Sequence, residues 1–269
     1  MSDQEAQIPH QEHEEQMLGA DMNQQDEIDF GFQSVPRAEK ESRVKEVFDS
    51  VAKNYDIMND LMSMGVHRLW KDALMDWLAP RPHQTLLDLA GGTGDVALRF
   101  LKRGGGSVKI VDINEEMLQA GQKRSVMRPY QDRLEWIAGN AEALPLADNS
   151  VDRATIAFGL RNVTNRDVAL REIHRVLKPG GRFCCLEFSA VENPVLSKIY
   201  DQWSFKILPK MGQLVARDGD SYQYLVESIR KFPDQFALSD MMVSAGFAQV
   251  RYRNLSGGIA AIHSGWKLD

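Results

Sequence analysis

The chain has 269 residues, of which 43% are hydrophobic and 26% are charged, and its formal net charge at pH 7 is −6. This composition indicates a globular protein with one sizeable core, and the sequence contains no run of about 18 apolar residues that would span a bilayer. The two cysteines, Cys184 and Cys185, are adjacent and would point to opposite faces of a strand. The sequence therefore indicates neither a metal site nor a disulfide framework.

The acidic residues are concentrated at the N-terminus. Nine of the 38 acidic side chains and none of the 32 basic ones precede Arg37, so the remainder carries 38 − 9 = 29 acidic and 32 basic side chains. We expect residues 1–36 to form a disordered acidic tail, because they contain too few apolar side chains to offset the entropy of ordering. Deletion up to Ser34 is accordingly expected to leave activity unchanged.

The rest of the chain carries 32 basic and 29 acidic side chains, which gives it no concentrated basic face of the kind that binds nucleic acid. The N-terminus has neither the basic nor the apolar region of a signal peptide. We therefore expect a cytoplasmic protein without a nucleic-acid partner. We predict that residues 37–269 form a single domain.

Helices come first in this domain, and strands then alternate with helices. Two helical segments occupy residues 37–82. The second ends before Pro80 and Pro82, because proline does not continue a helix. The predicted strands that follow are Thr85–Leu89, Val108–Val111, Leu134–Ala138, Arg153–Phe158 and Arg182–Phe188, with helices at Asp95–Arg103, Glu115–Ser125 and Asp167–Leu177. This alternation indicates βαβ units and a mostly parallel sheet.

The C-terminal part adds an inserted cover, one more helix and a hairpin. The cover spans residues 190–235 and contains two predicted helices. The segments are the cover helices Val195–Ile207 and Tyr222–Phe232, the helix Gln235–Ala245, and the hairpin strands Phe247–Tyr252 and Ile259–Ser264. The whole pattern predicts an α/β fold with a mostly parallel seven-stranded sheet, flanking helices and a C-terminal β-hairpin.

A glycine-rich turn follows the first strand of the alternating region, in the sequence Leu86-Leu87-Asp88-Leu89-Ala90-Gly91-Gly92-Thr93-Gly94-Asp95. Glycines let the backbone turn sharply and let a ligand approach the main chain, so Gly91 and the preceding Asp88 are candidate cofactor-binding residues. About 20 residues later Asp112 ends the next strand, where a carboxylate accepts hydrogen bonds from ribose hydroxyls. Asp95 would repel a pyrophosphate, which favours a nucleoside cofactor with an amino-acid tail over a dinucleotide.

Asn140 and Ala141 directly follow the third strand. The Asn140 amide offers both a donor and an acceptor, which suits the edge of an adenine. Because ligands of open α/β sheets bind beyond the carboxyl ends of the strands, the three strand ends together indicate one nucleoside site.

Several blocks of the chain resemble the ubiquinone/menaquinone biosynthesis C-methyltransferase family, which belongs to the class I, Rossmann-like methyltransferases. The resemblance covers nearly everything from about Val44 to Lys267. Its blocks are Val51-Ala52-Lys53-Asn54-Tyr55-Asp56-Ile57-Met58-Asn59-Asp60, Leu69-Trp70-Lys71, Phe158-Gly159-Leu160-Arg161-Asn162-Val163, Leu177-Lys178-Pro179-Gly180-Gly181, Asp218-Gly219-Asp220-Ser221-Tyr222-Gln223-Tyr224-Leu225 and Phe232-Pro233-Asp234.

This resemblance implies methylation of a ring carbon of a polyprenylated benzoquinol or naphthoquinol, with S-adenosylmethionine as the donor. The reaction belongs to ubiquinone biosynthesis, menaquinone biosynthesis or both. The family's cofactor positions match Thr93, Asp112, Asn140 and Ala141. Two positions depart from the family pattern: Ala157 stands where Ser is frequent, and Ala90 replaces the first glycine of the usual motif.

The resemblance also implies catalytic roles for Tyr55, Arg161 and Asn162, near N-terminal helices at 37–82 that lie by the substrate. The ring carbon becomes nucleophilic when a neighbouring hydroxyl loses its proton. A guanidinium keeps its charge, so we expect Arg161 to stabilise the phenolate and Asn162 to hold a water that relays the proton. His67 is an alternative base. Tyr222 and Tyr224 are candidates for the wall of the quinol pocket, and ordinary helix packing is the alternative for both.

Other functions remain open at this point. A NAD-type oxidoreductase is disfavoured by the glycine spacing, and a non-catalytic scaffold is disfavoured by the intact Asp112 and Arg161-Asn162 pair. A methyltransferase with another phenolic or lipid acceptor is a third reading. The sequence leaves the oligomeric state open, with a homo-oligomer among the alternatives.

A polyprenyl quinol is too apolar to diffuse in water, so we expect peripheral membrane contact or membership of a quinone-biosynthesis complex. The segment 194–215 carries an apolar stripe at helical spacing, flanked by lysines that suit anionic head groups. The stripe residues are Leu196, Ile199, Tyr200, Trp203 and Ile207, and the lysines are Lys198, Lys206 and Lys210. Packing of the stripe against the sheet is the alternative.

Overall fold

The computed structural model describes residues 27–51, 60, 63, 65–192, 194, 198, 200, 202–203 and 219–269. Its main feature is a seven-stranded sheet with the strand order β5-β4-β3-β6-β7-β9-β8. The strands are β3 (Thr85–Leu89), β4 (Ser107–Asp112), β5 (Leu134–Ala138), β6 (Val151–Ala157), β7 (Leu177–Phe188), β8 (Ala248–Leu255) and β9 (Ala260–Trp266). β3 to β7 run parallel, whereas β9 is antiparallel to β7 and β8. The predicted sheet and C-terminal hairpin are confirmed.

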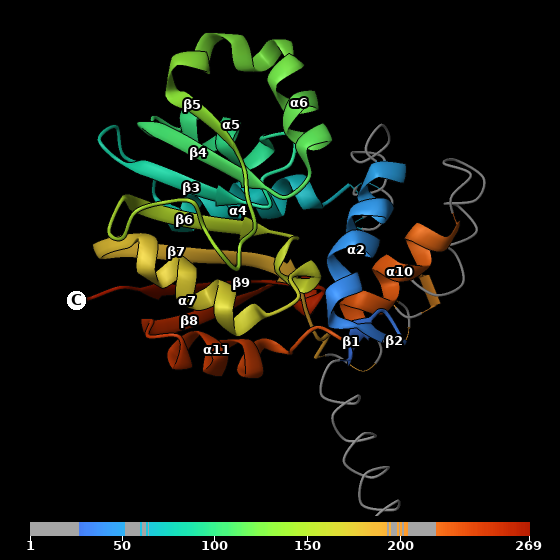
Figure 1. Cartoon of the computed structure of the whole chain (residues 1–269). Coiled ribbons are helices and arrows are strands. Elements are labelled where there is room, and N and C mark those ends of the chain that lie inside the picture. The colour runs from blue at the N-terminus through green and yellow to red at the C-terminus, as the bar shows by residue number, and fades with distance from the viewer. Residues whose placement is uncertain are drawn as a thin grey trace, which may run out of the picture.

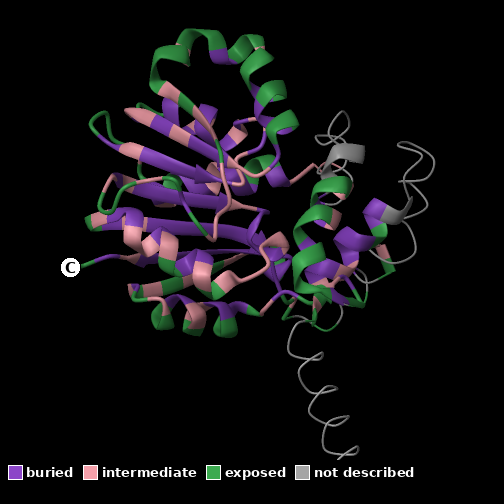
Figure 2. Ribbon diagram, in the orientation of Figure 1, coloured by how far each residue is buried: buried purple, intermediate pink, exposed green. Residues whose placement is uncertain are grey.

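Helices cover both faces of the sheet (Figure 1). One face packs against α4 (His67–Leu78), α5 (Asp95–Lys102) and α6 (Glu115–Lys123), and the other against α7 (Arg166–Val176) and α11 (Gln235–Ser244). Because the central strands are covered on both sides, most of their residues are buried, as Figure 2 shows in purple. The sheet is therefore a rigid platform whose strand ends carry the site.

A second group of elements lies beyond the carboxyl ends of the strands (Figure 1). It comprises the antiparallel hairpin of β1 (Glu27–Phe30) and β2 (Gln33–Pro36), the helix α2 (Arg37–Val51) and the helix α10 (Gly219–Arg230). α2 contacts both the hairpin and α10. These elements, which come from the two ends of the chain, form one wall over the sheet.

The hairpin corrects the predicted extent of the acidic tail. Residues 27–36 were expected to be disordered with the rest of the 1–36 segment, but they form β1 and β2. Two apolar side chains explain the difference: Val35 is buried, and the ring of Phe30 stacks on that of Tyr224. The packing of these two apolar side chains outweighs the polar composition of the segment. Residues 1–26 lie outside the described part of the chain.

Other element boundaries shift slightly. The predicted helix Glu115–Ser125 ends at Lys123 and is followed by the 3-10 helix η2 (Ser125–Arg133). β7 includes the predicted turn before Arg182, because Gly180 N donates to Lys267 O at 2.8 Å and Lys267 N donates to Gly181 O at 3.0 Å. Two further 3-10 helices, η3 (Leu160–Asn162) and η5 (Ser256–Gly258), connect β6 to α7 and β8 to β9.

The predicted cover is described only in part. Its second helix is α10, while most of the first, Val195–Ile207, lies outside the described residues. Of the apolar stripe, Tyr200 is buried and Trp203 packs against the core of the sheet. These two side chains therefore point inward. No helix within the described residues is long and apolar enough to cross a membrane.

Candidate active site

A cavity that is partly open to solvent lies beyond the carboxyl ends of β3, β4, β5 and β6. This is where open α/β sheets bind their ligands. Its lining includes the strand-end residues Ala90, Asp112, Asn140, Ala141 and Phe158, the loop residues Asn162 and Val163, and Glu41, Val44 and Lys45 of α2. The cavity therefore has a floor of strand ends and a wall formed by α2.

Asp112 ends β4 with its carboxylate held by the backbone. Gly92 N donates to Oδ2 at 2.8 Å, and Asn114 N donates to Oδ1 at 2.9 Å. Burial raises the pKa of this carboxyl, although the hydrogen bonds from the backbone oppose the rise. Each carboxylate oxygen accepts more than one hydrogen bond, so Asp112 keeps acceptor capacity toward the cavity. This geometry suits the paired hydroxyls of a ribose.

Asn140 lies directly after β5, at the neighbouring strand end. Its Oδ1 accepts from Glu142 N at 2.8 Å, which stabilises the local turn, and its Nδ2 donates to Glu41 Oε2 at 2.9 Å. Glu41 belongs to α2, so this hydrogen bond ties the wall of the cavity to its floor. Asn140 and Ala141 both line the cavity, as their place in the sequence predicts.

Two turns at the strand ends have unusual backbone conformations. Ala90, after β3, has φ of 47°, and Phe158, after β6, has φ of 60°. Residues other than glycine rarely adopt this left-handed region, and such strain gathers where ligands bind. The turns touch, because a Cβ added to Gly159 would lie 2.5 Å from the Cβ of Ala90. Glycine at 159 is therefore required for the two strand ends to meet.

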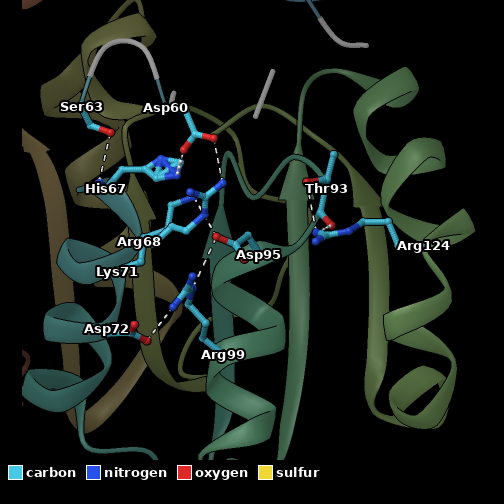
Figure 3. Close-up of polar contacts among 10 residues, drawn as sticks. All are labelled: Asp60, Ser63, His67, Arg68, Lys71, Asp72, Thr93, Asp95, Arg99 and Arg124. Atoms are coloured by element: carbon cyan, nitrogen blue, oxygen red, sulfur yellow. Dashed lines mark hydrogen bonds and ion pairs between the residues drawn. The ribbon is translucent and has the colours of Figure 1, made fainter. Parts of the chain in front are cut away.

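A smaller recess opens on the other side of the glycine turn, with Ala90 and Gly92 shared between it and the cavity. Its charged lining comes from three elements: Lys71 from α4, Asp88 from β3 and Asp95 from α5. Lys71 Nζ lies 2.9 Å from Asp95 Oδ2. Figure 3 shows this pair within a larger polar network. The recess is also lined by Gly91, Thr93, Val96 and Ala157.

The carboxylates of the recess differ in their electrostatics. Burial would raise the pKa of Asp95, but Lys71, followed by Arg99 and Arg124, outweighs it and lowers that pKa to about 2. Burial raises the pKa of Asp88 to about 7, although a hydrogen bond from Thr155 Oγ1 at 2.9 Å opposes the rise. The recess therefore presents an ammonium, a permanent carboxylate and a carboxyl that titrates near neutrality.

Arg161 lies behind the cavity rather than on its surface. Its Nη1 is 3.0 Å from Glu187 Oε1 of β7, and both side chains are only 2% exposed. The same Nη1 donates to the carbonyl of Phe158, and the guanidinium lies over the ring of Phe188 at 5.8 Å. Arg161 is not among the residues that line the cavity. The pair therefore anchors η3, which also carries Asn162, to β7.

Asn162, unlike the neighbouring Arg161, lines the cavity. Tyr224 of α10 donates its hydroxyl proton to Asn162 Oδ1 at 3.2 Å. Burial raises the pKa of Tyr224 to about 12, so its hydroxyl remains a donor across physiological pH. The Asn162 amide is therefore held from outside the loop that carries it.

Two further residues, Tyr55 and His67, were predicted from the sequence to take part in the reaction. Tyr55 lies outside the described residues. His67 is buried, with Nε2 3.3 Å from Asp60 Oδ1. Burial and then the charge of Lys71 lower the pKa of His67 to about 4, although Asp60 opposes this shift. His67 is therefore neutral at physiological pH, and His67 is not among the residues of the cavity or the recess.

The strand ends thus bring together Asp112, Asn140, Ala141 and Asn162 in the cavity, and Asp88, Gly91 and Thr93 in the recess. Sequence reasoning did not assign roles to Glu41, Lys71 and Glu187. The one signal for Lys71 was its place in a block of family resemblance. Glu41 and Glu187 give no such signal, because their partners are remote in sequence.

The residues present fit S-adenosylmethionine. The carboxylate of Asp112 faces the cavity where a ribose would lie, and the charged recess beyond the glycine turn suits a zwitterionic amino-acid moiety. Within the described part of the chain, no group of three or more His, Cys, Asp or Glu residues is placed to hold a metal ion.

Comparison with known proteins supports the same assignment. Residues 37–267 match the model of the ubiE/COQ5 methyltransferase family. Two relatives, both named ubiquinone/menaquinone biosynthesis C-methyltransferase UbiE, come from Acidiphilium cryptum and Brucella abortus. The first is 60% identical over 90% of this chain and 97% of its own length, and the second is 57% identical over 90% and 91%.

Solved structures share the fold at low sequence identity. A SAM-dependent methyltransferase from Aquifex aeolicus matches with a TM-score of 0.54 and 17% identity, over 73% of this chain and 89% of its own. Phosphoethanolamine N-methyltransferase 2 from Haemonchus contortus, in complex with S-adenosyl-L-methionine, matches with a TM-score of 0.56 and 14% identity, over 74% of this chain and 52% of its own.

Proposed function

The chain belongs to the ubiE/COQ5 methyltransferase family, and on that premise we propose that its cavity and recess together bind S-adenosylmethionine beside a polyprenyl quinol. It is an S-adenosylmethionine-dependent C-methyltransferase of ubiquinone/menaquinone biosynthesis. Membership of this family removes the NAD-type oxidoreductase as an alternative. The observation that carries the proposal is the juxtaposition, across one glycine turn, of the Asp112 carboxylate and the charged recess.

The proposed cofactor contacts follow from the shape of the site. Asp112 binds the ribose hydroxyls, and Asn140 with Ala141 meets the adenine. Gly91 allows close approach of the ligand to the backbone, and Thr93 lies on the same turn.

Lys71, which sequence reasoning left without a role, binds the carboxylate of the amino-acid moiety, while Asp88 and Asp95 bind its ammonium. Support comes from their shared lining of the recess and from the 2.9 Å Lys71–Asp95 pair, in which the Asp95 side chain is 30% exposed.

The cofactor supplies a methyl group on a cationic sulfur, and the protein supplies position and electrostatics. Asn162 holds the phenolic oxygen of the quinol, or a water that takes its proton, at the wall of the cavity. Arg161 lies behind it and stabilises the developing phenolate through its charge, which Glu187 partly balances. Phe158 and Val163 line the cavity beside Asn162 and exclude water there. Tyr55 is proposed as a further substrate contact on the basis of the family resemblance.

The acceptor is a benzoquinol, a naphthoquinol or both. Purified protein incubated with labelled S-adenosylmethionine is expected to transfer the label to at least one of the two quinols. Asn162→Ala should lower kcat of this transfer by more than tenfold while the Kd for S-adenosylmethionine changes by less than about twofold, because the amide acts on the acceptor. Equal losses in kcat and cofactor affinity would favour a structural role of the loop. Absence of transfer to both quinols would contradict the proposed acceptor class.

Contact with the membrane is a separate part of the proposal, since a polyprenyl chain requires a lipid environment. Tyr200 and Trp203 pack inward, so the contact falls to other residues of the 190–235 cover or to a partner in a quinone-biosynthesis complex. We propose a cytoplasmic enzyme that meets its substrate at the inner face of the membrane, as a monomer or a homo-oligomer. Flotation with anionic liposomes that contain a long-chain quinol tests direct contact, and failure to float would favour delivery by a partner.

A further inference from the structure

The N-terminal hairpin of β1 and β2 packs on a single face of α10. The family match begins at Arg37, so the hairpin precedes the matched region. Three of its contacts are made with Tyr224 and Glu227 of α10 and with Lys231, which directly follows the helix, and their spacing places them along one side of it. The hairpin thus lies along α10 as a brace, beside α2 and beyond the carboxyl ends of the strands (Figure 1).

The contacts are of three different kinds. The ring of Phe30 stacks on that of Tyr224, with centroids 4.2 Å apart and planes inclined by 23°. Phe32 N donates to Glu227 Oε2 at 2.9 Å, and Lys231 Nζ lies 3.3 Å from Asp29 Oδ1. The hairpin backbone approaches Glu227 closely at Gly31, because a Cβ added there would lie 2.4 Å from Glu227 Oε2.

Tyr224 connects this brace to the candidate active site. Its side chain is 5% exposed, with the Phe30 ring against it and its hydroxyl 3.2 Å from Asn162 Oδ1. When the hydroxyl donates to Oδ1, the oxygen end of the amide is engaged and the Nδ2 donor is left for the cavity that Asn162 lines. The hydrogen bond therefore selects one of the two orientations that the amide can adopt.

We propose that Tyr224 is a positioning residue that orients the Asn162 amide toward the acceptor, and that the hairpin keeps Tyr224 in place. This inference rests on the proposed role of Asn162 in methyl transfer. It assigns a function to residues 27–36, although deletion up to Ser34 was expected from the sequence to leave activity nearly unchanged. The brace acts on the acceptor half of the reaction, because neither Phe30 nor Tyr224 lines the cofactor recess.

The test is a double-mutant cycle between Tyr224→Phe and Asn162→Ala. Tyr224→Phe removes only the hydroxyl and is expected to lower kcat of quinol methylation about threefold to tenfold, with the Kd for S-adenosylmethionine unchanged. In the Asn162→Ala background the same substitution should have no further effect on kcat, because the amide it orients is gone. A further loss of equal size in that background overturns the inference.

The hairpin is tested with a matched pair of phenylalanine substitutions. Phe30→Ala should lower kcat in the same direction as Tyr224→Phe, also without change in cofactor affinity. Phe236→Ala is the control, since Phe236 is 67% exposed on α11 and contacts only the ring of Tyr252 among the aromatic contacts described. Deletion of residues 1–36 should reproduce the Phe30→Ala loss, whereas deletion of residues 1–26 should not. Equal kcat for both deletions overturns the role of the hairpin.

A second readout keeps the inference separate from the proposed reaction. The side-chain amide resonances of Asn162, assigned by nuclear magnetic resonance, should shift in Tyr224→Phe and Phe30→Ala and remain unchanged in Phe236→Ala. If wild-type protein methylates neither quinol, the proposed function fails, while these shifts still report the positioning of the amide. Unchanged Asn162 resonances in a folded Tyr224→Phe variant overturn the positioning role itself.

Discussion

Two ion pairs of nearly equal length lie near the carboxyl ends of the strands, and they differ in exposure. Arg161 and Glu187 are 3.0 Å apart with side chains 2% exposed, whereas Lys71 and Asp95 are 2.9 Å apart with side chains 9% and 30% exposed. The first pair is sealed behind the cavity wall, and the second lines the recess. Distance alone does not tell what such a pair does. Burial decides whether its members are committed to each other or available to a ligand.

The difference has an energetic basis. Two charges removed completely from water depend on each other, because an unpaired buried charge is strongly unfavourable. A pair that borders a water-filled recess keeps part of its hydration and can exchange one partner for a charged ligand group at moderate cost. We therefore expect the sealed pair to contribute to stability and to the electrostatics around Asn162, and we propose that the open pair, Lys71 and Asp95, takes part in cofactor recognition.

The largest effect is expected from breaking the sealed pair. Glu187→Gln leaves the Arg161 charge uncompensated and should lower the free energy of unfolding by about 3–5 kcal/mol, as measured by denaturant titration. The double variant Arg161→Met/Glu187→Leu should recover most of that stability, since apolar groups of similar volume replace the pair, and should still lack normal methyl transfer. A double variant as unstable as the single one would contradict the comparison.

The second-largest effect is expected at Asp112, whose carboxylate is held by backbone N–H groups rather than by a charged side chain. Asp112→Ala should weaken the binding of S-adenosylhomocysteine and of 5′-methylthioadenosine alike by about 2–4 kcal/mol. Both ligands carry the ribose, which loses two charge-assisted hydrogen bonds in this variant. Titration calorimetry on the folded variant measures both affinities. An unchanged affinity for either ligand would contradict the assignment of the ribose site.

The role of the Lys71–Asp95 pair is tested with two ligands, of which only one carries an amino-acid moiety. Lys71→Met should weaken S-adenosylhomocysteine by about 1.5–3 kcal/mol, the range for a hydrogen bond to a charged group, and should leave 5′-methylthioadenosine, which has no amino-acid moiety, unaffected. Arg99→Met is the matched control, because Arg99 contacts Asp95 at 3.4 Å without lining the recess. An equal loss of affinity for both ligands in Lys71→Met would mean that Lys71 supports the fold and does not bind the amino-acid moiety.

The smallest effect concerns pH. The pKa of Asp88 is raised to about 7, so this carboxyl takes up a proton as the pH falls through neutrality and loses its attraction for the ligand ammonium. The affinity for S-adenosylhomocysteine should therefore fall by at most about tenfold per unit as the pH is lowered below about 7. The dependence should be absent in Asp88→Asn and for 5′-methylthioadenosine. A flat profile in wild-type protein would leave the ammonium to Asp95 alone.

The elements that sequence predicts well are those with local causes. The glycine turn after Leu89, the acidic end of β4 and the Asn140 turn all lie where the pattern of strands and turn residues places them. Each depends on a few consecutive residues, because alternation within a strand and backbone freedom at glycine are properties of a short segment. The hairpin at residues 27–36 was missed for the opposite reason, since its composition is polar and its anchors become visible only when α10 lies beside it.

By itself the sequence determined the order of the strands in the main sheet and of its flanking helices, the family, the cofactor and the strand-end residues that form the floor of the cavity. The tertiary structure alone decided which side chains hold that floor: Glu187 lies 26 residues from Arg161, Tyr224 lies 62 from Asn162, and Glu41 lies 99 from Asn140. It also decided that the Arg161–Glu187 pair is sealed while the Lys71–Asp95 pair lines the recess. The physical reason is that pairing and burial depend on how whole elements pack against one another, and that information is spread over the chain rather than contained in any one segment.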